Sequence, residues 1–102
     1  MTHVVISPVA ESDLEDIWLT IAADDPQTAI RIVRTIGTRI SDLAQYPRRG
    51  PRRYDIRASV RMLVEGPYLI LFETQPDTDE GPIDEVRIVR VVDGRRDLKR
   101  LF

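Results

Sequence analysis

Arginine is the residue type in this sequence whose number and spacing could do chemistry. Every basic side chain except Lys99 is an arginine, and nine arginines fall between residues 31 and 61, where Asp42 and Asp55 are the only acidic residues. The planar guanidinium group forms paired hydrogen bonds with carboxylates and phosphates. As a group these arginines indicate a surface that binds an anionic partner, whereas a local ion pair is an equal alternative for any one of them.

Other catalytic or ligand-binding patterns are lacking in the sequence. The single histidine, His3, lies near the N-terminus, and there is no cysteine, so no set of residues has the spacing of a metal site. The sequence also has neither a glycine-rich phosphate-binding loop nor a nucleophile elbow. We therefore expect no metal ion and no cofactor.

Length and composition limit the class of protein. A chain of 102 residues predicts one domain, residues 1–102, with a single core. No apolar run approaches the roughly 18 residues that span a bilayer, and the N-terminus lacks the basic flank and apolar core of a signal peptide. Together with the absence of cysteine, these features predict a bacterial cytoplasmic protein without membrane contact.

Two pairs of a capping residue and a proline predict where helices begin. Residues 3–6 form a short β-like run, and Ser7-Pro8 suits a helix start, because serine accepts free amide hydrogen bonds and proline needs none. Asp25-Pro26 repeats this signal. Apolar residues at helical spacing then predict helices over residues 8–23 and 26 to about 45. The short link between them predicts an antiparallel helical hairpin.

Two residues of these helices carry particular expectations. Trp18 lies on the apolar stripe of the first helix, which predicts that its side chain belongs to the core. Gly37 interrupts the second helix, at a cost of about 1 kcal/mol relative to alanine. We expect this glycine to allow close packing between helices.

The C-terminal half of the sequence predicts a sheet. A loop rich in arginine, proline and glycine at 48–59 precedes strand-like runs at 60–65, 67–75 and 84–92, whose short connections favour antiparallel pairing. The segment Tyr68–Phe72 is apolar on both faces and should be the middle strand. The expected fold is α+β: a short N-terminal strand and an antiparallel helical hairpin packed on a small antiparallel β-sheet.

The residues after the last strand should fold back onto the domain. A turn is expected from Gly94 to Asp97, and Leu98 and Leu101 should then anchor the final residues on the domain. The alternative is that this basic and apolar tail presents a surface to a partner.

Side-chain alternation along the strands places arginines beside apolar residues. Arg61 and Glu65 share one face of the first strand, and on the last strand Arg90 shares a face with Ile88, opposite Arg87. An arginine among apolar neighbours needs a partner carboxylate. The alternative is an arginine that binds a ligand or clamps a phosphate. The candidate carboxylates are Glu65, Glu73 and Glu85.

Four segments of the chain resemble, in their order and spacing, the ParE branch of the ParE/RelE toxin superfamily. Together they cover nearly the whole chain; each alone is weakly specific, but the four in this order form a fairly specific pattern. Asp93 stands where many ParE-like chains have histidine. The segments are Val5–Pro8 with Ala10–Trp18, Leu43–Gly50, Val60-Arg61 with Tyr68–Phe72, and Ile88–Asp97.

This resemblance implies the toxin component of a type II toxin–antitoxin system, the class associated with plasmid stabilization. ParE-branch toxins are expected to inhibit DNA gyrase, and hence replication, by binding and without a chemistry of their own. The resemblance also implies a ParD-like antitoxin that threads an acidic and apolar segment over the toxin. A toxin–antitoxin hetero-oligomer, which contacts operator DNA mainly through the antitoxin, is expected as well.

Two alternatives to a gyrase inhibitor remain. The RelE branch consists of ribosome-dependent mRNA endoribonucleases, and here Arg61, Glu65 and Arg87 could supply the base and the phosphate clamp. However, Leu69 stands where RelE-type enzymes tend to carry arginine, and no tyrosine or histidine near the C-terminus could act as the acid. The other alternative is a degenerate toxin that serves only as a binding module. The sequence therefore favours a binding inhibitor with no catalytic residues.

Charge pattern and resemblance together give two sets of candidate contacts. The first set is expected to pair with antitoxin carboxylates, and the second, in the C-terminal tail, is expected to bind the target. The antitoxin-binding candidates are Arg31, Arg34, Arg49, Arg52, Arg53, Arg57 and Arg61, and the target-binding candidates are Arg95, Arg96, Leu98, Leu101 and Phe102.

Overall fold

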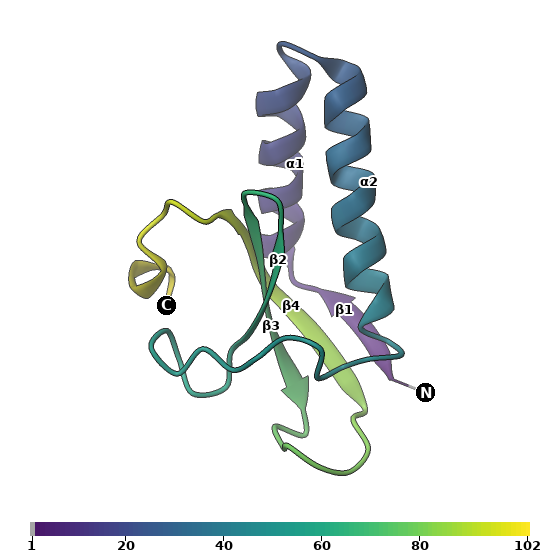
Figure 1. Cartoon of the computed structure of the whole chain (residues 1–102), viewed down its shortest axis with the longest axis vertical. Coiled ribbons are helices and arrows are strands. Elements are labelled where there is room, and N and C mark those ends of the chain that lie inside the picture. Colours follow the sequence, from purple (N-terminus) through teal and green to yellow (C-terminus); the bar gives the residue numbers. More distant parts are fainter. Residues whose placement is uncertain (1) are drawn as a thin grey trace.

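The computed structural model describes residues 2–102 and consists of a helical hairpin packed on a four-stranded sheet, followed by a short 3-10 helix (Figure 1). This arrangement confirms the predicted α+β fold. In chain order the elements are β1 (His3–Ile6), α1 (Pro8–Ala22), α2 (Pro26–Asp42), β2 (Arg61–Glu65), β3 (Tyr68–Gln75), β4 (Glu85–Asp93) and the 3-10 helix η1 (Leu98–Leu101).

Both helices begin where the capping signals predict. The Ser7 hydroxyl accepts a hydrogen bond from the amide of Ala10 at 3.1 Å, and the Asp25 carboxylate accepts one from the amide of Thr28 at 3.2 Å. A proline follows each cap in the first turn, where its missing N–H costs nothing. Helix α2 ends at Asp42, before the predicted end near residue 45, because the chain turns there.

The sheet is mixed, with strand order β1-β4-β3-β2. Strands β2 and β4 each pair with β3 in antiparallel orientation, as their short connections predict. Strand β1 adds to the free side of β4 in parallel, with Val4 opposite Val86 and Ile6 opposite Ile88. The expected antiparallel sheet thus covers the three C-terminal strands only, because β1 meets β4 through a long crossover rather than a tight turn.

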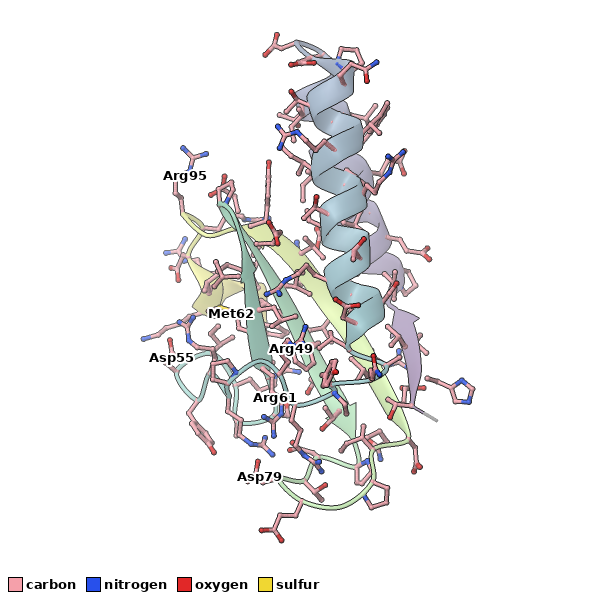
Figure 2. The ribbon with its side chains drawn as sticks, turned by 45° about the vertical axis from the view of Figure 1, so that its right-hand side comes forward. Arg49, Asp55, Arg61, Met62, Asp79 and Arg95 are labelled. Atoms are coloured by element: carbon pink, nitrogen blue, oxygen red, sulfur yellow. The ribbon has the colours of Figure 1, made fainter. Side chains whose placement is uncertain are left out.

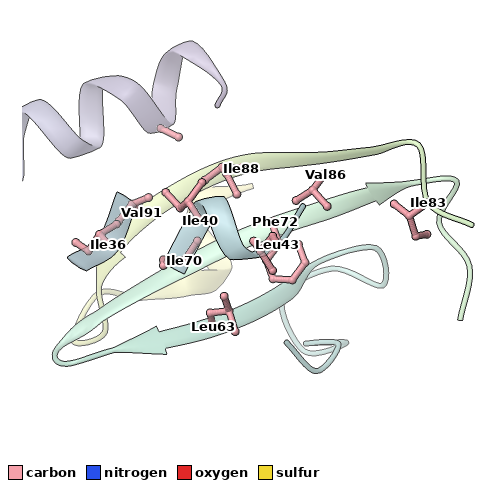
Figure 3. Close-up of a cluster of buried hydrophobic side chains, with 11 residues drawn as sticks. Ile36, Ile40, Leu43, Leu63, Ile70, Phe72, Ile83, Val86, Ile88 and Val91 are labelled. Atoms are coloured by element: carbon pink, nitrogen blue, oxygen red, sulfur yellow. The ribbon is translucent and has the colours of Figure 1, made fainter. Parts of the chain in front are cut away.

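The main core lies between the helical hairpin and one face of the sheet (Figure 3). The predicted middle strand is confirmed: β3 is an interior strand, and its residues 69–72 are buried on both faces. Burial of these apolar side chains is the main source of stability. The buried members of this cluster are Ala10, Ile36, Ile40, Leu43, Leu63, Ile70, Phe72, Ile83, Val86, Ile88 and Val91.

A second, smaller cluster covers the opposite face of the sheet. Its buried members are Val60, Leu69, Leu71 and Val92, and half-buried side chains of the arginine-rich loop and the tail pack against them. Among these are Leu98 and Leu101, so the prediction that they anchor the tail is confirmed.

Two expectations about the helices are wrong. The side chain of Trp18 is half-buried and belongs to neither cluster, because the connected ends of the hairpin extend beyond the sheet (Figure 1). At Gly37, an added Cβ atom would meet nothing within 4 Å. This glycine therefore allows no close helix contact.

Candidate functional site

Two arginines of the arginine-rich loop, Arg48 and Arg52, and Arg61 of β2 face the protein's own acidic connection between β3 and β4, residues 76–84. Arg48 donates from Nε to the carbonyl oxygen of Thr78 at 2.9 Å and from Nη2 to that of Gly81 at 2.9 Å. Arg52 and Arg61 bind the carboxylates of the same connection, as described below. We call Arg48, Arg52 and Arg61 the arginine clasp.

The two inner arginines of the clasp converge on one carboxylate. Arg52 Nε and Arg61 Nη2 donate to Asp79 Oδ1 at 3.0 and 2.9 Å, and Arg52 Nη1 donates to Asp77 Oδ1 at 2.7 Å. Figure 2 shows Arg61 beside the sheet and Asp79 in the connection below it. The hydrogen bond from Arg52 is the main cause that lowers the pKa of Asp79. Two predicted antitoxin contacts are therefore neutralised within the protein.

The arginine-rich loop also covers the free edge of β2. The amide of Met62 donates to the carbonyl oxygen of Pro51 at 3.0 Å, and the amide of Arg53 donates to that of Val60 at 2.8 Å. A Cβ atom at Gly50 would clash with the carbonyl of Met62, so this close approach requires glycine. The covered edge leaves few backbone groups free to pair with another strand.

Arg53 is a third predicted contact that pairs internally. Its Nε and Nη2 donate to the two oxygens of Asp55 at 2.8 and 2.7 Å. These bonds lower the pKa of Asp55 to about 2. In Figure 2, Asp55 lies on the loop near Met62, whose sulfur accepts a hydrogen bond from Arg53 Nη1 at 3.0 Å.

The four remaining antitoxin-binding candidates are exposed. Arg31 and Arg34 lie on the outer face of α2, Arg49 stacks 4.4 Å above the ring of Tyr46, and Arg57 lies 4.4 Å above the ring of Phe102. A hollow of about 190 Å³ adjoins this face of α2. It is lined by Arg31, Ile32, Thr35, Glu65, Gly66, Pro67 and Tyr68.

The residues of the nuclease alternative do not form one site. Glu65 lies beside α2, where Arg39 Nε approaches its carboxylate at 3.6 Å. Arg61 is buried on this helical side of the sheet. Arg87 is exposed on the opposite face, because its neighbours in β4 point into the core. The two clamp candidates, Arg61 and Arg87, therefore lie on opposite faces of the sheet.

The partner carboxylates are only partly those predicted. Arg87 Nη2 lies 3.5 Å from the predicted Glu85. Arg61, by contrast, pairs with Asp79 and not with Glu65 or Glu73. The connection of residues 76–84 is rich in acidic side chains, and this feature of the sequence is the signal that could have indicated the pairing of Arg61.

A β-bulge changes the side-chain alternation of β4. Leu71 is paired with Arg90 but Phe72 with Ile88, so Val89 is an extra residue. As a result Ile88 and Val91 share the helical face, although strict alternation would place them on opposite faces. Arg90 reaches α1, which covers this face, and pairs there with Asp13 at 2.8 Å. Asp13 is not among the partner carboxylates predicted for the strand arginines.

The tail presents its basic residues to solvent and its apolar residues to the sheet. Arg95 is 91% exposed and pairs with Asp93, whose pKa its hydrogen bonds lower to about 2. Arg96 is exposed, whereas the two leucines of η1 are half-buried on the second cluster. Phe102 is 40% exposed. The target-binding candidates thus divide into an outward charged set and an inward anchoring set.

Neither a metal site nor a membrane span is found in the described part of the chain. Residues 2–102 contain no group of three His, Cys, Asp or Glu side chains that could hold a metal ion. Within the same residues, no helix is long and apolar enough to cross a bilayer.

Comparison with known proteins gives consistent results. The sequence profile described as "ParE toxin of type II toxin-antitoxin system, parDE" matches residues 4–98. A candidate toxin of Sinorhizobium fredii, Y4kP, is 36% identical over 67 residues, which are 65% of this chain and 69% of that protein. A solved structure described as "Chromosomal ParDE TA system from P. aeruginosa" superposes with a TM-score of 0.73 at 23% identity. It covers 91% of this chain and 96% of its own, and it shows that the fold is shared.

The match to the family profile spans nearly the whole chain and includes both α-helices, strands β2, β3 and β4, and all of β1 except His3. It also contains the arginine-rich loop and most of the tail. The chain therefore belongs to the family of ParE toxins of type II toxin–antitoxin systems.

Proposed function

We propose that this ParE-type toxin inhibits DNA gyrase by binding, and that a ParD-like antitoxin neutralises it. The observation that carries the binding mechanism is that neither clamp candidate is free beside the base candidate Glu65. Arg87 lies on the opposite face of the sheet, and Arg61 is paired with Asp79. General acid–base chemistry on RNA needs these groups within hydrogen-bond reach of one phosphate. Family membership supports gyrase as the target.

A supercoiling assay with purified toxin and gyrase tests the mechanism. Inhibited supercoiling, or accumulation of cleaved DNA, is the expected result. Gyrase that is unaffected by a large excess of folded toxin would overturn the proposal. Messenger RNA cleavage in a translating extract would instead favour the RelE-type alternative.

The outer face of α2 is the antitoxin contact that we propose. Arg31 and Arg34 project from this face, and neither pairs with a carboxylate of residues 2–102. Their guanidinium groups are available for the acidic segment of an antitoxin, whereas those of Arg52, Arg53 and Arg61 are already occupied. The adjoining hollow offers an apolar surface through Ile32 and Pro67.

Charge reversal on α2 tests this contact. The Arg31→Glu/Arg34→Glu variant should bind the antitoxin at least about tenfold more weakly in calorimetric titrations, because two attractive contacts become repulsive. Glu15→Arg, exposed on α1, is the matched control and should leave affinity unchanged. If the wild type, the double variant and the Glu15→Arg control bind the antitoxin with equal affinity, α2 is not part of the interface.

A further inference from the structure

The guanidinium group of Arg61 is buried but only partly used. Its side chain is 7% exposed; Nη1 donates to the carbonyl oxygen of Gly50 at 3.3 Å, and Nη2 donates to Asp79 Oδ1 at 2.9 Å. Nε of Arg61 is buried and has no hydrogen-bond partner within residues 2–102. A buried donor without an acceptor is costly, so such an atom indicates an acceptor position that an ion or a water can fill.

The unused atom lies on an edge suited to an oxyanion. Nε and Nη2 of a guanidinium group form one edge, which can hold two oxygens of a carboxylate or phosphate at once. Asp79 gives only Oδ1 to this edge of Arg61, and that same oxygen also accepts a bond from Arg52 Nε at 3.0 Å. A phosphate group carries three acceptor oxygens. It would match these donors better than one shared carboxylate oxygen does.

We propose that Arg52 and Arg61 form a binding site for a phosphate group, which Asp79 occupies in the free protein. The clasp brings three guanidinium groups to the connection, against the carboxylates of Asp77 and Asp79. When the side chain of Asp79 rotates into solvent, the carboxylate of Asp77, which pairs with Arg52, is the one that still balances the charge of the three guanidinium groups of the clasp. The site then attracts an anion. This inference goes beyond the proposed function, because it requires neither gyrase nor an antitoxin.

Asp79 can leave the site without unfolding the connection. Its side chain is 72% exposed, in contrast to the side chains of Arg52 and Arg61, which are 11% and 7% exposed. Arg48 holds the backbone of the connection independently, through the carbonyl oxygens of Thr78 and Gly81. A rotation of the Asp79 side chain into solvent is therefore sufficient to admit a phosphate.

Titration of the full chain with inorganic phosphate tests the site. The Nε–Hε signals of Arg52 and Arg61 are followed by NMR, with sodium chloride keeping the ionic strength constant. We expect saturable shifts, and about tenfold tighter binding in Asp79→Asn, because the competing carboxylate is removed. Asp55→Asn is the matched control, since Asp55 pairs with Arg53 alone. It should bind phosphate as the wild type does.

Lysine substitutions test the paired geometry. In the Asp79→Asn background, Arg61→Lys should weaken phosphate binding about tenfold, because an ammonium group cannot form the two-bonded edge. Where that variant fails to fold by circular dichroism, Arg52→Lys carries the test. Undiminished binding in the folded variants would overturn the proposal.

The source of the phosphate is distinguished by a second probe. A short DNA duplex that shifts the Arg61 signal saturably in Asp79→Asn would identify a phosphodiester, and a response to inorganic phosphate alone would identify the free ion. Either result supports the site. Equal affinity of Asp79→Asn and Asp55→Asn, or shifts of all arginines without saturation, would overturn it.

Discussion

Asp13 of α1 and Arg90 of β4 form an ion pair with two hydrogen bonds, at 2.8 and 2.9 Å, that ties the helical hairpin to the sheet. Asp13 also accepts a bond from the amide of Val91 at 3.0 Å. Strand β1 pairs with β4 only as far as Ile88. The amide of Val91 therefore has no acceptor from β1. The carboxylate therefore takes over an acceptor position that β1 leaves empty.

Removing this carboxylate charge should destabilise the fold. We expect Asp13→Asn to lower the free energy of unfolding by about 2–3 kcal/mol, because Arg90 would remain largely buried without a countercharge. Urea denaturation measures the change. Glu15→Gln, on an exposed position of the same helix, should change it by less than about 0.5 kcal/mol. Similar values for both variants would show that the pair contributes nothing specific.

Two glycines should respond oppositely to alanine. Gly50→Ala places Cβ against the backbone carbonyl of Met62 and should cost about 1–3 kcal/mol, because the loop must move away from the edge of β2. Gly37→Ala meets nothing within 4 Å and should add up to about 1 kcal/mol of helix stability. Thermal unfolding of both proteins checks this. A Gly50→Ala protein as stable as the wild type would show that the loop does not depend on the close approach.

Acid should remove the contribution of the Asp93–Arg95 contact. The amide, Nε and Nη2 of Arg95 donate to the Asp93 carboxylate at 2.9, 3.0 and 2.8 Å, and the pKa of Asp93 falls from 3.8 to about 2. Because the folded pKa is the lower one, the stabilisation is complete above about pH 4 and is lost as the pH falls through 2.

The measurement compares wild type with Asp93→Asn. Their difference in free energy of unfolding should be constant above about pH 4 and should shrink toward pH 2. It should be small throughout, because Arg95 is 91% exposed and solvent screens the pair. A carboxyl carbon signal of Asp93 that titrates near 4 would contradict the expectation.

The tail should be required for toxicity but not for antitoxin binding. Deleting residues 98–102 removes the two leucines that fix the tail on the second cluster, so Arg95 and Arg96 would lose their position. We expect growth after induced expression to be restored, while antitoxin affinity stays unchanged. Arg95→Glu/Arg96→Glu, which retains the anchor, should give the same result.

The two tail variants separate packing from contact. A truncated protein that remains fully toxic would show that the tail only packs. Toxicity lost in the truncation but kept in the charge-reversed variant would show that the arginines do not touch the target. Circular dichroism of both proteins confirms that the domain is folded.

Local signals made the helices and the antiparallel strands predictable. Ser7-Pro8 and Asp25-Pro26 fix helix starts through bonds three residues away, and the Gly66-Pro67 turn joins β2 to β3 directly. Such signals lie within a few residues of the structure that they determine. The pairing of β1 with β4 has no local signal, because its partners lie more than 80 residues apart in the chain.

The candidate site was less predictable because its contacts depend on loops. The path of the 76–84 connection decides which carboxylate pairs with Arg61. The alternation of side chains along a strand does not predict the path of a loop. The same alternation failed for Val91, which shares a face with Ile88, because one extra residue in β4 shifts the pattern. Trp18 was misplaced because apolar spacing predicts a face of a helix but not how far the sheet extends beneath it.

The position of β4 between β1 and β3 also determines when the molecule can be completed. The helical hairpin can form early in synthesis, but β1 has no partner until residues 85–93 have left the ribosome. Pairing over such a separation is slow compared with helix formation. A partly made chain therefore lacks a closed core. The finished toxin surface, including the tail that follows β4, arises only after β4 has been synthesised.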